Sequence, residues 1–177
     1  MKKINWNDVQ EANEFELLPA GGYECQILRV DDNEEKEYLE LEFDICAGPQ
    51  KDFFVNSCAG LDWWPGSTIK SYKQKALPFF KAMLTAVENS NDGFTANTFS
   101  DPSELINKKV GMVIGHEQYW NGNGQKRTRI RVASFRSLDK IRKGDFKIPE
   151  LKINDYNKPE IDGFVDVTDT DDSDLPF

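Results

Sequence analysis

Arg127, Arg129 and Arg131 occupy alternate positions in the segment QKRTRIRVASFRSL, residues 125–138. Alternate residues of a β-strand lie on one face of the sheet, about 7 Å apart. Three guanidinium groups in such a row repel one another unless an anion neutralises them, and each can donate paired hydrogen bonds to a phosphate. The row is therefore predicted to hold a phosphate backbone, while Ile130 and Val132 face the core.

Aromatic residues come directly before the turn that leads into this segment. Tyr119 and Trp120 precede NGNG, residues 121–124, which is a strong β-hairpin signal because Asn and Gly tolerate positive φ. A basic strand beside aromatic rings is typical of a single-strand nucleic-acid groove, in which each stacked base contributes ~1–3 kcal/mol. Lys109 and Lys126 extend this predicted surface.

Four residues earlier in the chain are further candidates for the same surface. Trp63 and Trp64 stand before Pro65-Gly66, where they form either a stacking platform or a plug beneath a loop. Lys70 and Lys73 either extend the basic surface or solubilise the helix that follows. The alternative for the arginine row is an ion-paired face with Glu40, Glu42 and Asp44, and such surface pairs stabilise a fold little.

Catalytic signatures are weak. His116 is the only histidine, and the sequence has no GxSxG motif, phosphate-binding Walker loop or dinucleotide glycine fingerprint. Cys25, Cys46 and Cys58 give neither a disulfide framework nor a CxxC metal site. Acidic clusters such as Asp31-Asp32 are more typical of solvated turns than of metal sites. We therefore predict no catalytic residue, no cofactor and no metal, with a metal-dependent nuclease as an alternative.

Charge is strongly segregated along the 177 residues, although the formal net charge is −9. Residues 1–63 hold 5 Lys/Arg and 15 Asp/Glu, residues 64–143 hold 14 and 6, and residues 155–177 hold 1 and 8. A negative total ordinarily argues against a nucleic-acid partner, whereas a basic middle region favours a polyanion. No apolar run resembles a signal peptide or a membrane span, so we expect a cytoplasmic protein with reduced thiols.

Hydrophobic periodicity gives the expected elements. Strands are predicted over 23–30, 36–46, 52–55, 109–120 and 125–138, and an irregular loop over 56–70. The main helical segment is predicted over 71–90, with Pro78 in the first turn of a helix that buries Phe79, Phe80, Met83, Leu84 and Val87. The order β-β-β-α-β-β predicts a mainly β, five-stranded OB-fold barrel, with another small α+β sheet as the alternative. We expect an N-terminal arm over 1–20, one domain over 21–151, and a disordered acidic tail over 152–177.

The last nine residues, DTDDSDLPF, combine negative charge with an apolar tip. An apolar pocket with a basic lip can capture the Phe177 ring and a terminal carboxylate together, and nearby aspartates steer the encounter. The predicted partner-binding residues are Asp171, Asp172, Asp174, Leu175, Pro176 and Phe177. The alternative is an incidental acidic end. The tail is also expected to compete with a nucleic acid for the basic groove.

The tip DDSDLPF resembles the acidic C-terminal tip of bacterial single-stranded DNA-binding proteins. In addition, LPAGGYECQILRV, KSYKQKALPFFKAMLTAVENSN and NGNGQKRTRIRVASFRSLDKIRKGDFKIPEL resemble a family of phage and prophage single-strand binding proteins from Gram-positive bacteria. The resemblance implies an OB fold, sequence-independent single-stranded DNA binding without catalysis, and a tip that recruits replication, recombination and repair proteins in the bacterial host cytoplasm.

The resemblance does not assign contact residues, so the arginine row and the aromatic residues rest on spacing alone. A non-DNA-binding OB adaptor protein is the other alternative. Homo-oligomer formation, the choice between DNA and RNA, and the identity of the tail's partners stay open.

Overall fold

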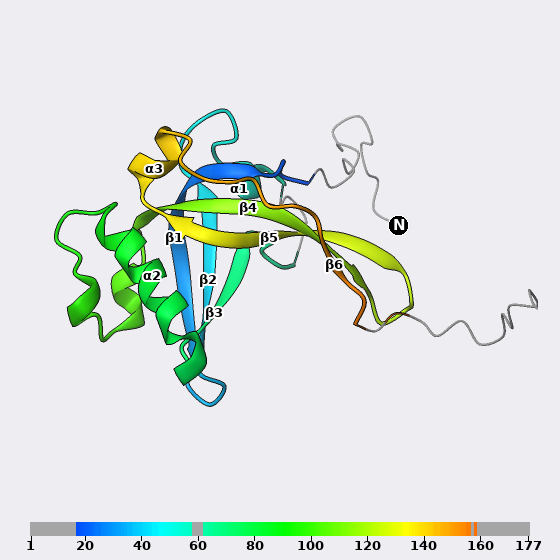
Figure 1. Cartoon of the computed structure of the whole chain (residues 1–177), viewed down its shortest axis with the longest axis horizontal. Coiled ribbons are helices and arrows are strands. Elements are labelled where there is room, and N and C mark those ends of the chain that lie inside the picture. Colours follow the sequence, from blue (N-terminus) through cyan, green and yellow to red (C-terminus); the bar gives the residue numbers. More distant parts are fainter. Residues whose placement is uncertain (1–16, 58–61, 157, 159–177) are drawn as a thin grey trace, which may run out of the picture.

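The computed structural model describes residues 17–57, 62–156 and 158, and this part of the chain is mainly β. The first two strands, β1 (Gly21–Asn33) and β2 (Tyr38–Ile45), pair antiparallel. A β-bulge between Ile27 and Arg29 bends β1. Its first residues, up to Gln26, therefore pair with β4, while β2 follows the strand to its end. Figure 1 shows β1 turning from the direction of β4 into the direction of β2 and β3.

Five strands form an antiparallel path in the order β3-β2-β1-β4-β5. The strands at the two ends of this path are β3 (Ser67–Ser71) and β5 (Lys126–Arg136), and β4 spans Lys109–Trp120. The predicted hairpin of residues 109–138 is confirmed, with Tyr119 opposite Arg127 and Trp120 opposite Lys126. This β4–β5 hairpin projects beyond β1, β2 and β3 (Figure 1).

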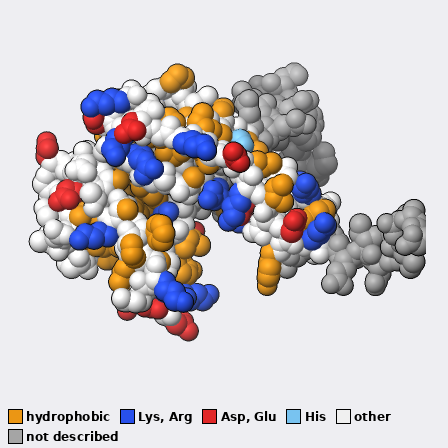
Figure 2. Space-filling model, in the orientation of Figure 1, with side chains coloured by type: hydrophobic (Ala, Val, Ile, Leu, Met, Phe, Trp, Pro, Cys, Tyr) orange, Lys and Arg blue, Asp and Glu red, His pale blue; other side chains and the backbone are white. Residues whose placement is uncertain are grey.

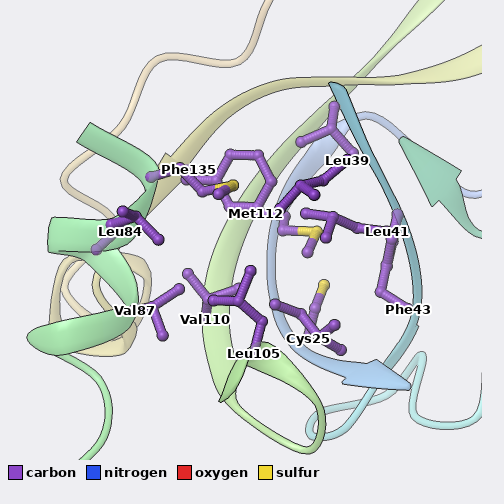
Figure 3. Packing of buried hydrophobic residues seen from close by; sticks show 14 of the residues in the cluster. Cys25, Leu39, Leu41, Phe43, Leu84, Val87, Leu105, Val110, Met112 and Phe135 are labelled. Atoms are coloured by element: carbon purple, nitrogen blue, oxygen red, sulfur yellow. The ribbon is translucent and has the colours of Figure 1, made fainter. Parts of the chain in front are cut away.

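The core lies between the curved sheet and the main helix. The alternation predicted for β2 is confirmed, because Leu39, Leu41, Phe43 and Ile45 are all buried. They meet residues of β4 and β5 such as Met112 and Phe135, and Figure 3 shows these side chains packing beside Leu84 and Val87 of the helix. Burial of this apolar surface is the main force that holds the sheet in its curved form.

The third strand was predicted in the wrong place. Residues 52–55 were expected to be a strand, but Phe53–Ser57 form the short helix α1. The carboxylate of Asp44 accepts backbone hydrogen bonds from Phe54 at 2.9 Å and Val55 at 3.0 Å, so it caps this helix. The third strand is instead β3, which was expected to be loop and helix, and it pairs with β2 from Glu42↔Ser67 to Tyr38↔Ser71.

The helical region follows the prediction closely. A 3-10 turn over Gln74–Ala76 leads into α2 (Leu77–Glu88), with Pro78 in its first turn. Phe80, Met83, Leu84 and Val87 are buried as predicted, but Phe79 is 78% exposed because it lies outside the i, i+3, i+4, i+7 stripe that faces the sheet. Further 3-10 turns cover Ala96–Thr98 and Pro102–Leu105, and the Asp101 side chain caps the second of them.

The end of the described chain returns to the sheet. After α3 (Leu138–Arg142), residues 144–154 form a segment that we call the strap. The strap ends in β6 (Lys152–Asn154), which pairs parallel to β4 from Glu117↔Lys152 to Tyr119↔Asn154. The expectation of disorder from residue 152 is therefore wrong for these three residues. The rest of the predicted tail, apart from Asp155, Tyr156 and Lys158, and the N-terminal arm up to residue 16 lie outside the described residues.

Candidate functional site

A groove of about 850 Å³ lies between the two end strands of the sheet path. The β3 side provides Trp63, Pro65 and residues 67–70, and the β5 side provides residues 127–132. The remaining lining residues are Leu17, Glu40, Glu117, Tyr119 and Lys152. Figure 2 shows the hollow between the body of the molecule and the projecting hairpin, with Lys and Arg side chains along it.

The arginine row forms one wall of the groove. Arg127, Arg129 and Arg131 stand opposite Tyr119, Glu117 and Gly115 in the β4–β5 ladder, so the three guanidiniums share one face as the alternation predicted. Val132 is buried in the core, and Ile130 packs against the core from its partly buried position. The strand that carries the row is therefore anchored to the core by the apolar residues that alternate with the arginines.

Glu117 and Tyr119 fix the middle arginine in position. The Nε and Nη2 atoms of Arg129 lie 2.9 and 2.8 Å from Oε2 of Glu117, and its guanidinium lies 4.7 Å from the centre of the Tyr119 ring. Glu117 is only 5% exposed. Burial raises the pKa of Glu117, but hydrogen bonds and charge from Arg129 and Lys152 outweigh this effect and hold the pKa below its usual value.

The predicted alternative, pairing of the row with acids of β2, does not match the ion pairs found in the described residues. Arg129 pairs with Glu117 of β4. Asp44 caps α1, and Glu42 lies 3.7 Å from Arg29. Glu40 lines the groove together with the row.

The two adjacent tryptophans have different environments. Trp63 is 61% exposed and lines the groove. Trp64 packs against the core, and its Nε1 donates a hydrogen bond to the Phe43 carbonyl at 3.0 Å. Trp63 is therefore exposed at the groove, whereas Trp64 belongs to the packing around the core.

Lys70 lines the groove from the β3 side. Its register partner is the core residue Leu39, and its Nζ lies 4.7 Å over the ring of Phe135 from β5. Burial, and then the charge of Arg131, lower the pKa of Lys70. Lys70 therefore brings a cation to the place where the two end strands approach each other.

Other predicted residues lie outside the groove lining. Trp120 and Lys126 are register partners at the tip of the hairpin, and Trp120 projects to the face opposite Tyr119 because neighbouring strand residues alternate. Lys73 is exposed before the 3-10 turn that leads to α2. Lys109 begins β4 at its far end, near Glu24, whose pKa is lowered mainly by hydrogen bonds from Arg142 and less by the charge of Lys109.

Two charged groove residues were missed by the sequence reasoning. Glu117 is two positions from Tyr119 and so shares its face, which the alternation could have indicated. Lys152 had no such signal, because it lies in a segment without periodicity and reaches the groove only through the pairing of β6 with β4. Its Nζ is 3.3 Å from Oε1 of Glu117.

His116 Nε2 is 2.8 Å from the Leu18 carbonyl, so this side chain ties the start of the described chain to β4.

Within residues 17–57, 62–156 and 158, no group of three or more His, Cys, Asp and Glu side chains is arranged to bind a metal ion. None of the described helices has the length and hydropathy needed to cross a membrane.

No protein-family model matches the sequence, and no curated protein matches it significantly. The resemblance to phage single-strand binding proteins therefore stays a prediction.

Proposed function

We propose that this protein binds single-stranded DNA without sequence preference through the groove between β3 and β5. The observation that carries the proposal is the composition of the groove: five cations, namely Lys70, Arg127, Arg129, Arg131 and Lys152, with the rings of Trp63 and Tyr119 among them. Cations that follow a phosphate backbone and rings that stack on bases are the two components of such a site. Stacking does not depend on base identity, which agrees with binding of any sequence.

The strand arrangement supports an OB fold for this domain. An OB fold is a partly open five-stranded barrel that binds oligonucleotides over its second and third strands and the adjoining loops. Closing the path β3-β2-β1-β4-β5 between its two ends would give five strands around one core, and α2 lies between the third and fourth strands in sequence. The contact of Lys70 of β3 with Phe135 of β5 supports such a closure.

The C-terminal tip is proposed to recruit proteins of replication, recombination and repair. Its support is the sequence DDSDLPF, since residues 159–177 lie outside the described part of the structure. No catalytic step is proposed, and incubation of labelled DNA with magnesium or manganese tests the nuclease alternative directly.

The deciding experiment is a titration with oligo-dT at several salt concentrations, followed by tryptophan fluorescence. If all five cations contact phosphates, the log–log dependence of affinity on salt should have a slope of about −3.5, at about −0.7 per contact. Replacing Arg127, Arg129 and Arg131 by Met should reduce it to about −1.4. Replacing the exposed residues Lys81, Lys140 and Lys147 by Met removes the same amount of charge. In this control variant the slope should stay close to the wild-type value.

The outcomes separate the candidates. Quenching on binding supports stacking on a tryptophan, and binding without quenching assigns the stacking to residues other than the tryptophans. Absence of binding at low salt would overturn the proposal and favour a protein-recruiting adaptor. Equal loss in both triple variants would mean that overall charge, rather than the groove, holds the strand.

A further inference from the structure

The strap is seated closely on the sheet. A Cβ atom added at Gly22 of β1 would lie 2.5 Å from the ring of Phe146, and one added at Gly115 of β4 would lie 2.4 Å from Pro149. Such distances are far below van der Waals contact, so these two positions need glycine for the strap to lie where it does. Figure 1 shows the strap passing from α3 along β4 to β6.

The strap ends at the buried carboxylate of the groove. Oε1 of Glu117 lies 3.3 Å from Lys152 Nζ and 3.4 Å from Asn154 Nδ2, while Oε2 forms an ion pair with Arg129. Glu117 therefore joins a cation from the hairpin to a cation from the strap. Leaving this buried carboxylate without its partners would be costly, so it favours the docked strap.

Both cations remain available to a ligand. The side chains of Arg129 and Lys152 are 56% and 52% exposed, although each contacts Glu117. A guanidinium has five N–H donors and an ammonium has three, so a single carboxylate does not use them all. The two cations with Glu117 carry a net charge of +1 at the groove surface, which a phosphate can neutralise.

We propose that the strap is a wall of the single-strand groove, in which Lys152 contacts a phosphate and Glu117 is the positioning residue that holds Lys152 beside Arg129. This inference rests on the proposed function. Because Lys152 reaches the groove only when β6 is paired, strand binding and strap docking must strengthen each other by the same factor. Lys152 is thus part of the binding site rather than the start of the tail.

A matched pair of strap variants tests the contact. Lys152→Met and Lys147→Met each remove one charge from the strap, but Lys147 is exposed and does not line the groove. In oligo-dT titrations, Lys152→Met should reduce the salt slope by about 0.7 and lower the affinity at low salt about threefold to tenfold. Lys147→Met should change the slope by less than half that amount. Equal slopes for the two variants would overturn the inference while the proposed function stands.

Hydrogen–deuterium exchange tests the coupling. Oligo-dT should slow exchange of the amides of residues 150–154 in the wild type, and this extra protection should shrink in Lys152→Met. Without DNA, Glu117→Gln should speed exchange of the same amides relative to wild type, whereas a Lys147→Met control should not. Unchanged exchange in Glu117→Gln, or a wild type whose strap gains no protection on binding, would refute the coupling. A wild type that fails to bind oligo-dT would refute the inference together with the proposed function.

Discussion

Trp63 and Trp64 are neighbours in sequence but have different surroundings. Trp63 lines the groove, while Trp64 is anchored to the Phe43 carbonyl and packs on the core. Substitutions at these two positions therefore test ligand stacking separately from packing.

Trp63→Ala should weaken oligo-dT binding roughly 5- to 150-fold, since a stacked base contributes about 1–3 kcal/mol. The free energy of unfolding, measured with urea, should change less than in Trp64→Ala because the Trp63 side chain is largely exposed. Trp64→Ala should instead destabilise the fold by about 2–4 kcal/mol, because it removes a packed ring and its hydrogen bond. If both variants lost stability and neither lost affinity, Trp63 would have no stacking role.

Asp44 links two elements, β2 and α1. Its carboxylate accepts backbone hydrogen bonds from Ile45, Phe54 and Val55, at 2.8, 2.9 and 3.0 Å. The side chain belongs to a strand but is buried, because it replaces the missing partners of a helix N-terminus.

Asp44→Ala should therefore lower the free energy of unfolding by about 2–4 kcal/mol, because it leaves backbone donors buried without an acceptor. Asp44→Asn keeps one oxygen and should lose less. Equilibrium denaturation with urea measures both changes. Equal stability of wild type and Asp44→Ala would show that the three hydrogen bonds contribute nothing net.

The elements differ in how far the sequence could predict them. The hairpin of β4 and β5 was predictable, because two long alternating segments flank NGNG and each step of alternation adds to the signal. The strand β3 has only five residues and lies at the end of the sheet path, with Ile69 exposed, so its pattern is too short to stand out. DFFV has strand-forming residues, yet the carboxylate of Asp44, eight residues before Asp52, accepts hydrogen bonds from this segment's backbone and stabilises a helix there.

The candidate site was predictable only where its residues follow a clear alternating pattern within one strand or hairpin. The alternation of residues 127–131 placed the arginine row and, through the hairpin, Tyr119. The meeting of β3, β5 and β6 at one groove depends on the bend of β1 and the seating of the strap, which are tertiary contacts. For the same reason, the charge of Lys109 did not indicate that this residue lies outside the groove.

Charge segregation has a spatial counterpart at the scale of the whole molecule. The groove cations Lys70, Arg127, Arg129 and Arg131 belong to the basic residues 64–143, and the strongly acidic residues 155–177 follow β6 directly. Negative charge tethered beside a cationic groove competes with phosphates for it.

Deleting residues 155–177, which leaves β6 intact, should tighten oligo-dT binding on the order of threefold to tenfold at low salt. The difference should vanish near 1 M salt, where charges are screened beyond about 3 Å. A tail with all its Asp and Glu residues replaced by Asn and Gln should behave like the deletion, because it keeps the length and loses the charge. Unchanged or weaker binding after deletion would contradict the competition.

Leu17 and Lys152 line the same groove, although they are near opposite ends of the described chain. Whatever is joined before residue 17 or after residue 156 therefore enters the domain close to the groove. A polyhistidine purification tag fused directly before residue 17 or directly after residue 156 would add titratable rings there, and the titration of the tag would make the measured affinity depend on pH. A fluorescent dye at the same position would report on groove occupancy, so tag-free protein suits affinity measurements and end-labelled protein suits kinetics.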